Sequence, residues 1–247
     1  MDYLYYPGCS LEGTSREYDL AVRAMMDWAG AGLTQIRDWT CCGASAAESR
    51  SHLLSHVLPA RNLALAEAME AWDQILVPCS ACYLNLKKTE QAVQKDKALL
   101  AKINQVLAEE DLVLKGEVKV RHLLDVLVKD VDALEIKKRA DRRMQGLLAA
   151  PYYGCQCLRP FAVFDDPEDP RSMNNLILAT GAGVFQWDMG AQCCGASHTS
   201  TKPEAGLALV EKILWAARGA DLILTVCPMC QMNLEGYQKR LSREKGR

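Results

Sequence analysis

Ten of the eleven cysteines form one five-residue pattern that occurs twice along the chain. Each copy has a single cysteine, then a Cys-Cys-Gly triplet, then a C-x-x-C pair, and the intervals between these parts are 31 and 36 residues in the first copy and 37 and 32 in the second. The first quintet is Cys9, Cys41, Cys42, Cys79 and Cys82, and the second quintet is Cys155, Cys193, Cys194, Cys227 and Cys230. Because thiolates are soft ligands for metals, five of them in each half indicate two metal clusters and electron chemistry.

The number of thiols per half favours iron–sulfur clusters over zinc. Structural zinc takes four ligands in a tetrahedron, so a fifth thiol has no place in such a site. Adjacent cysteines suit a larger inorganic core, in which two irons take one sulfur each or one iron takes both. A conventional four-ligand cluster with a spare cysteine remains an alternative. The ligands are spread over about seventy residues in each half, so a folded scaffold must bring them together.

The repeat extends beyond the cysteines into the residues around them. Tyr5–Cys9 resembles Tyr152–Cys155, and the five residues that begin at Cys41 are identical to the five that begin at Cys193. Both C-x-x-C pairs follow an apolar run and continue into Asn-Leu. Such an internal repeat predicts a molecule built from two similar units.

Each half alternates between short apolar runs and segments with helical periodicity. This alternation predicts an α/β fold of two pseudo-symmetric strand–helix repeats with parallel sheets. Ligands gather at the carboxyl ends of strands in such sheets, and each cysteine group is expected at that position. The expected strands are Leu4–Tyr6, Gln35–Trp39, Asp73–Val77, Ala149–Tyr153, Gly183–Trp187 and Asp221–Val226, and the expected helices are Ser15–Ala29, Leu54–Ala71, Ser80–Val93, Ser172–Ala179, Ala205–Ala217 and Met229–Leu241.

The chain is expected to divide into two cysteine-rich domains joined by a linker. The first domain is placed at residues 1–94 and the second at 149–247. The charged segment 95–148 between them is predicted to be helical in Lys97–Glu110, His122–Val131 and Lys137–Leu147. Its basic residues are interpreted as solvated helix faces.

Composition excludes several classes of function. The 247 residues are 49% hydrophobic and carry a net charge of -2, without a long basic run, so nucleic-acid binding is not expected. The apolar runs are too short to span a membrane, and the start of the chain lacks the features of a signal peptide. We therefore expect a soluble, cytoplasmic protein whose cysteines are not a disulfide framework.

A few residues outside the quintets have types and positions that suit chemistry. His198 lies one helical turn after the second Cys-Cys pair and could donate a proton, although a surface or capping histidine is the alternative. Arg159 closely follows the second quintet's first cysteine and could bind an anionic substrate, although a surface salt bridge is the default. Gly43 and Gly195 are expected to let the backbone approach a cluster closely. Cys157 is interpreted as a spare buried cysteine, with an alternative ligand or redox thiol as the other reading.

The cysteine pattern, with glycine after each pair, resembles the CCG domain. The surrounding residues, among them Pro59–Leu63, Phe164–Pro170 and Cys227–Leu234, resemble the B-type subunit of heterodisulfide reductase and its bacterial relatives over nearly the whole chain. The resemblance implies that the ten quintet cysteines hold two noncubane [4Fe-4S] clusters. It also implies that a small-molecule disulfide, such as the one between coenzyme M and coenzyme B, is split between them. The implied partners are the family's A-type subunit, which carries flavin and iron–sulfur clusters, and its small ferredoxin-like C-type subunit.

Three hypotheses of function follow from the sequence. The first is the disulfide-reducing catalytic subunit of a heterodisulfide-reductase-type complex. The second is an electron-transfer subunit of a larger oxidoreductase, with the same clusters and no disulfide chemistry of its own. The third is a structural subunit whose fold is stabilised by zinc bound to the cysteines. Metal and sulfide analysis separates the third from the others, and reaction with a disulfide separates the first two.

Overall fold

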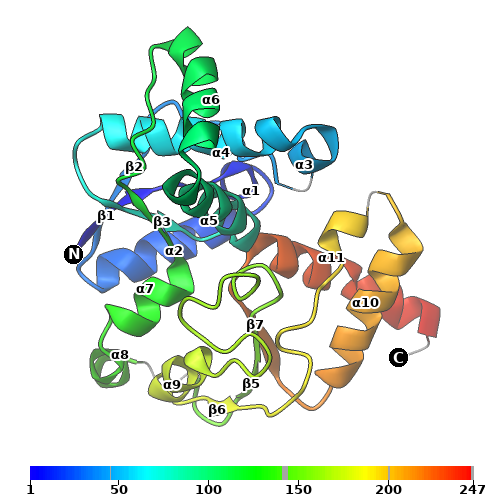
Figure 1. Ribbon diagram of the computed structural model, residues 1–247. Coiled ribbons are helices and arrows are strands. Elements are labelled where there is room, and N and C mark those ends of the chain that lie inside the picture. Colours follow the sequence, from blue (N-terminus) through cyan, green and yellow to red (C-terminus); the bar gives the residue numbers. More distant parts are fainter. Residues whose placement is uncertain (45, 141–143, 200, 246–247) are drawn as a thin grey trace. The chain divides into compact units, whose positions relative to one another are not determined.

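The computed structural model describes residues 1–44, 46–140, 144–199 and 201–245, and its contacts divide the chain into two compact units. Unit 1 is Met1–Leu123 and unit 2 is Leu124–Arg247. Each unit contains one parallel sheet (Figure 1). Each also contains one quintet, as the repeat in the sequence predicts. The predicted α/β class with two parallel sheets is confirmed.

Unit 1 is built on a four-stranded sheet in the order β2-β1-β3-β4, with every neighbouring pair parallel. Its central strands are almost completely buried, as expected for a parallel sheet with helices on both faces. The strands are β1 (Asp2–Tyr5), β2 (Gly32–Gln35), β3 (Gln74–Val77) and β4 (Lys119–His122). The helices are α1 (Cys9–Glu12), α2 (Arg16–Trp28), α3 (Ala47–Arg50), α4 (His52–Ala68), α5 (Ser80–Lys95), α6 (Lys97–Leu107) and the 3-10 turn η1 (Ala108–Glu110).

Strand β4 corrects the prediction that the segment between the repeats contains only helices. Lys119–His122 pairs in parallel with β3, from Gln74 opposite Lys119 to Val77 opposite His122. Val120 and His122 are buried, whereas the residues that alternate with them are more exposed, which is the period of a strand. The expected helix at His122–Val131 begins one residue later, as α7 (Leu123–Lys129). Four residues were too few to show this strand in the sequence.

The second strand of each unit ends earlier than the apolar pattern predicts. In unit 1 the expected strand Gln35–Trp39 is found at Gly32–Gln35, and residues 36–40 form a loop. Asp38 in that loop has a φ of 53°, which a strand does not allow. In unit 2 the expected strand Gly183–Trp187 shrinks to Gly183–Val184. The apolar side chains after both strands therefore belong to the loops that lead to the cysteine pairs.

Unit 2 has a three-stranded parallel sheet in the order β6-β5-β7, which matches the β2-β1-β3 part of the unit 1 sheet. The strands are β5 (Leu148–Tyr152), β6 (Gly183–Val184) and β7 (Leu222–Thr225). Its helices are α7, α8 (Ala133–Arg139), α9 (Ser172–Ala179), the 3-10 turn η3 (Ala196–His198), α10 (Pro203–Ala216) and α11 (Pro228–Lys245). The predicted helix Lys137–Leu147 is not found as one element: α8 ends at Arg139, and residues 141–143 lie outside the described residues.

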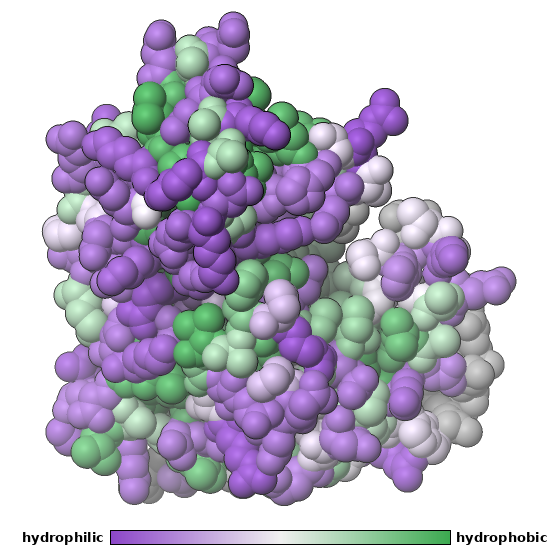
Figure 2. Space-filling view, viewed as in Figure 1, coloured by the Kyte–Doolittle hydropathy of each residue, from purple (hydrophilic) through white to green (hydrophobic). Residues whose placement is uncertain are grey.

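On the face that Figure 2 shows, hydrophilic residues make up most of the surface of unit 1, with apolar residues in smaller patches between them. Among the described residues, none of the helices has both the length and the hydropathy that a bilayer crossing requires.

Candidate metal centres

The first quintet gathers at the carboxyl edge of the unit 1 sheet, where three strands end. Cys9 follows β1, the Cys-Cys pair follows β2, and the C-x-x-C pair begins after β3. The sulfur atoms of Cys42 and Cys82 are 3.4 Å apart, although these residues are forty positions apart in the chain. Cys41 and Cys9 are exposed, whereas the other three thiols are buried. The quintet therefore has a closed inner side and an open outer side.

The buried side chain of Tyr6 lies close to most of the thiols of the first quintet. Tyr6 is fully buried, and burial raises the pKa of its phenol far above the ordinary value. Four nearby thiols raise that pKa further, because a thiolate opposes a second negative charge beside it. In order of effect they are Cys82, Cys42, Cys41 and Cys9. Four of the five thiols thus lie near one phenol ring.

Two side chains fix the backbone of the first Cys-Cys pair. The Tyr6 hydroxyl donates a hydrogen bond of 2.7 Å to the carbonyl of Thr40, the residue before the pair. The Asn85 amide, from α5, donates one of 3.0 Å to the carbonyl of Cys42. Because these bonds come from the segments that carry the other cysteines, the three parts of the quintet are locked to one another.

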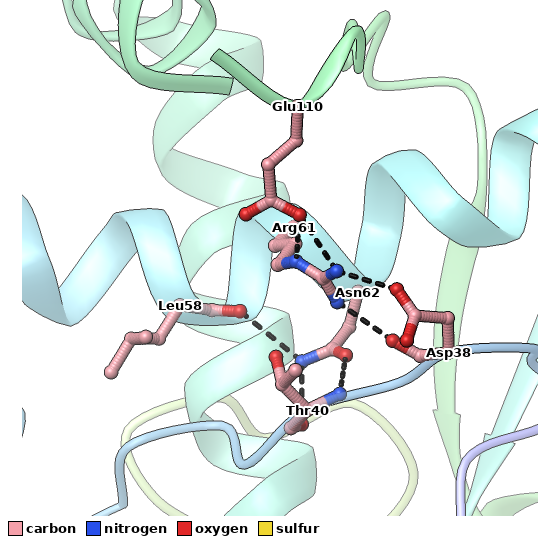
Figure 3. A network of polar contacts seen from close by, with 6 residues as sticks. All are labelled: Asp38, Thr40, Leu58, Arg61, Asn62 and Glu110. Carbon is pink, nitrogen blue, oxygen red and sulfur yellow. Dashed lines mark hydrogen bonds and ion pairs between the residues drawn. The ribbon is translucent and has the colours of Figure 1, made fainter. Parts of the chain in front are cut away.

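The loop before the first pair is also clamped to α4 (Figure 3). The Asn62 side chain accepts a hydrogen bond of 2.8 Å from the Thr40 amide and donates one of 3.0 Å to the Thr40 carbonyl. Arg61 pairs with the Asp38 carboxylate at 2.6 Å and with Glu110 at 2.7 Å. Sequence reasoning noted residues 59–63 only as part of the family resemblance and missed this clamp.

The second quintet repeats the arrangement in unit 2. The sulfur atoms of Cys194 and Cys230 are 3.5 Å apart. The Tyr152 hydroxyl donates to the carbonyl of Gln192, before the pair, at 2.7 Å, and the Asn233 amide donates to the Cys194 carbonyl at 2.6 Å. Burial and then the second-quintet thiols raise the pKa of Tyr152. The Tyr and Asn contacts are thus the same in both halves.

Thiols of the same quintet form hydrogen bonds with one another, and each such bond lowers the pKa of one thiol and raises the pKa of the other. A hydrogen bond from Cys41, followed by one from Cys82, lowers the pKa of Cys42 to about 4. The corresponding bond raises the pKa of Cys41. In unit 2 a hydrogen bond from Cys155 lowers the pKa of Cys193 to about 6. Each quintet can therefore present thiolate, which is the form that binds metal.

Glycines allow the close packing around the sulfur atoms. A Cβ on Gly8 would lie 2.8 Å from the Cys82 sulfur, and a Cβ on Gly154 would lie 3.1 Å from the Cys230 sulfur. Sequence reasoning missed both, although a glycine precedes the first cysteine in each copy. Gly43 and Gly195, the two glycines that the sequence pattern indicates, have positive φ, and a Cβ there would meet neighbouring side chains or backbone rather than a sulfur atom. Their suggested role toward a cluster stays a prediction.

Two basic side chains, His198 and Arg159, lie near the second quintet. Both lower the pKa of Cys193 electrostatically. Two effects on that pKa are larger: the hydrogen bond from Cys155, which lowers it, and burial, which raises it. The Arg159 guanidinium also pairs with Glu168 at 3.0 Å and donates to the Ala191 carbonyl. Arg159 therefore joins the loop that carries Glu168 to the segment before the second pair, and its binding of a substrate anion stays a prediction.

Cys157, the cysteine outside both repeats of the pattern, packs in the interior of unit 2. It is completely buried in the core of unit 2, among residues that include Leu158 and Met173. Its thiol donates a hydrogen bond of 3.2 Å to the Tyr153 carbonyl. This environment supports the interpretation of Cys157 as a packed structural cysteine.

The donor set of each quintet fits an iron–sulfur cluster by its chemistry. Within the described parts of the chain, no three or more His, Cys, Asp or Glu side chains are arranged to hold a metal ion as they stand. The sulfur atoms pair through hydrogen bonds instead. Each half nevertheless offers five soft thiols from three segments, and an inorganic core that spans several of them matches that donor set better than one ion does.

A cleft opens beside the exposed thiols of the first quintet. Its volume is about 640 Å³, and it lies along the loop that follows β2. The Glu12 carboxylate in its wall accepts hydrogen bonds from Gln35 at 2.8 Å and from the Trp39 indole at 3.3 Å. The lining residues are Cys9, Glu12, Gln35, Ile36, Arg37, Asp38, Trp39, Thr40 and Cys41. A small molecule in this cleft would reach both open thiols.

Comparison with known proteins identifies the family. The model of the CCG family, described as a cysteine-rich domain, matches residues 3–87 and 149–235, one match in each unit. The chain belongs to the CCG family. The two matches cover both quintets, so the family assignment and the internal repeat agree.

Curated relatives of this CCG protein are subunits of oxidoreductases. It is 32% identical over 96% of its length to the 8-methylmenaquinol:fumarate reductase membrane anchor subunit of Wolinella succinogenes, and the alignment covers 83% of that protein. It is 28% identical over 98% of its length to a protein of Archaeoglobus profundus that is named as similar to the B-type subunit of heterodisulfide reductase, again covering 83% of the relative. The B-type subunit of the ferredoxin:CoB-CoM heterodisulfide reductase of Methanosarcina mazei is 28% identical over 76% of the chain and 64% of the relative.

A solved structure shares the fold. A hypothetical protein from Helicobacter pylori superposes on 98% of the CCG protein with a TM-score of 0.78 and 12% identity. The chain spans 44% of that protein's length. At this identity the match describes the architecture alone.

Proposed function

We propose that this chain is the disulfide-reducing subunit of a heterodisulfide-reductase-type complex. The observation that carries the proposal is the duplicated thiol site, in which each quintet is held by the same Tyr and Asn contacts. Reduction of a disulfide to two thiols consumes two electrons and two protons, and two equivalent one-electron centres match that stoichiometry. The cleft beside Cys9 and Cys41 gives a small molecule access to one of them.

The ten quintet cysteines would hold two [4Fe-4S] clusters, of the noncubane kind that the family resemblance implies. When bound, such a cluster supplies electrons one at a time. The chain itself supplies the thiolates, excludes water from their inner side and fixes the backbone of each Cys-Cys pair. His198 is the proposed proton donor at the second quintet, since its charge acts on Cys193.

The proposed partners are a flavin- and cluster-bearing subunit of the A type and a ferredoxin-like subunit of the C type, as the resemblance implies. The relatives are named as subunits of larger reductases, which supports assembly into a complex. A cytoplasmic location for that complex is part of the proposal.

A second function is favoured by one specific observation. The relative that is 32% identical belongs to a fumarate reductase rather than a disulfide reductase. The same two centres would then pass electrons between partner subunits, and no disulfide would be cleaved. The two functions differ in whether a disulfide changes the state of the centres.

Stepwise reduction of the purified protein, followed by electron paramagnetic resonance, tests the proposal. With CoM-S-S-CoB or a related small disulfide present, we expect a paramagnetic signal that is absent without the disulfide. A Cys42→Ser variant should lose the signal, while Cys157→Ser, outside both quintets, should keep it. If no candidate disulfide changes the spectrum while electrons still pass to a partner, the electron-transfer function holds instead.

A further inference from the structure

The cleft beside the first quintet contains charged side chains to which the proposed function gives no role. Its volume is about 640 Å³, and its wall includes the exposed thiols of Cys9 and Cys41. Three charged residues, Glu12, Arg37 and Asp38, stand in the same wall. Helix α1 supplies Cys9 and Glu12, and the loop after β2 supplies the other three residues. A molecule that reaches the thiols therefore also meets these charges.

The charge of Asp38 is already offset within the protein. One nitrogen of the Arg61 guanidinium lies 2.6 Å from the Asp38 carboxylate, and another donates a hydrogen bond of 2.7 Å to the Asp38 carbonyl (Figure 3). Because this ion pair engages Asp38, Glu12 and Arg37 are the charges in the wall that remain for a ligand.

The Glu12 carboxylate is held in place through one of its two oxygen atoms. Its Oε1 accepts hydrogen bonds from the Gln35 amide at 2.8 Å and from the Trp39 indole at 3.3 Å. The Arg23 guanidinium donates a bond of 2.8 Å to the Gln35 carbonyl oxygen and so fixes the orientation of that amide. The other oxygen, Oε2, receives no hydrogen bond from the described residues. Glu12 is therefore oriented by two neutral donors and keeps an oxygen for a cation.

Arg37 and Thr40 offer hydrogen-bonding groups that the protein leaves unused. Arg37 is exposed, and its guanidinium forms no ion pair or hydrogen bond with any residue that the structure describes. The Thr40 hydroxyl is buried and likewise has no partner within the described parts of the chain. A guanidinium group binds carboxylates through paired N–H donors. The cleft thus combines a cation for a carboxylate, an anion for an ammonium group and a hydroxyl group.

We propose that this cleft selects disulfides of amino-acid thiols, with the zwitterionic head group bound between Arg37 and Glu12. The carboxylate of the head group pairs with Arg37, and its ammonium group pairs with the Oε2 atom of Glu12. A head group with only one charge meets one of these side chains favourably and the other unfavourably, whereas a zwitterion satisfies both. The inference rests on the proposed function, because it names the class of substrate for that site.

The second quintet lacks the acidic half of this arrangement. Glu12 stands three positions after Cys9, and the residue three positions after Cys155 is Leu158, which is 1% exposed. A buried leucine offers nothing to an ammonium group. Recognition of the head group therefore belongs to the first centre, and a mixed disulfide with one amino-acid half meets its requirement.

The binding test uses thioethers, which have no S–S bond to reduce. S-methyl-L-cysteine carries both charges, methylthiopropionate carries only the carboxylate, and methylthioethylamine carries only the ammonium group. Calorimetric titration of the purified, cluster-loaded full chain measures their affinities. We expect S-methyl-L-cysteine to bind about fivefold or more tightly than either of the others. Equal affinity for all three, or no binding of S-methyl-L-cysteine, would overturn the proposal.

Charge-removing variants assign each half of the head group to its partner. Glu12→Gln removes the negative charge and keeps an oxygen for the two existing hydrogen bonds, and Arg37→Gln removes the positive charge. Each should weaken the binding of S-methyl-L-cysteine by about fivefold or more and leave the iron content unchanged. Glu117→Gln and Lys119→Gln are the controls, because both residues are exposed beside the amino end of β4, away from the cysteine groups. The proposal fails if the cleft variants bind S-methyl-L-cysteine as tightly as the control variants do.

A second measurement separates this proposal from the proposed function. The disulfide-dependent paramagnetic signal is titrated with L-cystine, with cystamine, which carries only ammonium groups, and with dithiodipropionate, which carries only carboxylates. We expect L-cystine to give the signal at the lowest concentration, and Arg37→Gln to raise that concentration about fivefold or more. The same concentration for all three disulfides would support disulfide reduction and overturn the selection of amino-acid thiols. Selective thioether binding without a signal from any disulfide would support the head-group site and contradict disulfide reduction.

Discussion

At the scale of single residues, the sulfur atoms leave no room for extra carbon beside them. Gly8 and Gly154 precede the first cysteine of each quintet with φ values of 73° and 68°. A side chain at Gly8 meets the Cys82 sulfur, and one at Gly154 meets the Cys230 sulfur. These glycines therefore serve the thiol sites directly, since both the backbone conformation and the close approach require them.

We expect Gly8→Ala to lower the iron content of the protein by roughly half, because it displaces Cys82 in one of two quintets. Gly30→Ala is the control: its φ is 72°, and a Cβ there has nothing within 4 Å. Both variants carry the same backbone cost of about 1 kcal/mol, but only the first meets a sulfur atom. Iron analysis of the purified variants measures the difference. Equal iron in both would show that the contact does not matter.

A buried histidine predicts a pH dependence of stability. His56 in α4 forms a hydrogen bond of 3.0 Å with the Thr89 hydroxyl. Burial lowers the pKa of His56, and the charges of His52 and Lys88 lower it further. The Glu48 carboxylate acts in the opposite direction and has a smaller effect. The unfolded chain then binds a proton more readily than the folded one. The free energy of unfolding should fall as the pH drops below about 6.5.

Urea unfolding at pH values of about 7.5 and about 5.5, on either side of the ordinary histidine pKa, measures this effect. Replacing His56 by Gln should reduce the difference between the two pH values, whereas His52→Gln on the same helix should reduce it less. Acid-induced loss of the clusters would also lower stability, and comparing the three proteins at the same pH separates that effect from the protonation of His56. If all three proteins lose equal stability on acidification, His56 is not the source.

At the scale of elements, the loop after β2 depends on α4 for its shape. The Asn62 side chain is fully buried and makes bonds to both the amide and the carbonyl of Thr40. Asn62→Ala should cost roughly 2–3 kcal/mol of stability, because it leaves the Thr40 amide without its partner. It should also reduce iron binding, because the loop leads directly to Cys41.

Asn104→Ala provides a matched control for that variant. Asn104 makes the same pair of bonds to the amide and carbonyl of Leu114, at 2.9 and 3.0 Å, but that loop carries no cysteine. Both variants should be destabilised in chemical unfolding, and only Asn62→Ala should lose iron. Full iron in Asn62→Ala would contradict the role given to the clamp.

The elements that repeat are predictable from the sequence, whereas those that occur once are not. The duplicated cysteines indicated six strand ends. Strands β1, β3, β5 and β7 end just before the expected cysteine groups, whereas β2 and β6 end earlier and are joined to their cysteine pairs by loops. Strand β4 was not predicted because it is short and lies between the two cysteine repeats rather than within one of them. The hydrogen bonds between Asn62 and Thr40 were not predicted because the two residues are 22 positions apart, and no local sequence pattern indicates such a pairing. Tyr6 and Asn85 stand in repeated motifs, but only the structure shows what they bond.

At the scale of the whole molecule, duplication explains why one chain can hold two similar centres. Each unit repeats three parallel strands and one short contact between two cysteine sulfur atoms. Each also repeats the Tyr and Asn hydrogen bonds that hold the backbone at the Cys-Cys pair. The differences lie around the centres: the first has a cleft of about 640 Å³ beside it, and the second has Arg159 and His198. The two centres are therefore expected to differ in their access and in the charge around them.

Iron and acid-labile sulfide per chain test the central claim most directly. Two four-iron clusters predict about eight of each per chain. A Cys194→Ser variant should fall to about half, with the remaining iron in the first quintet. Zinc without sulfide, or iron for only one cluster in the native protein, would contradict the account.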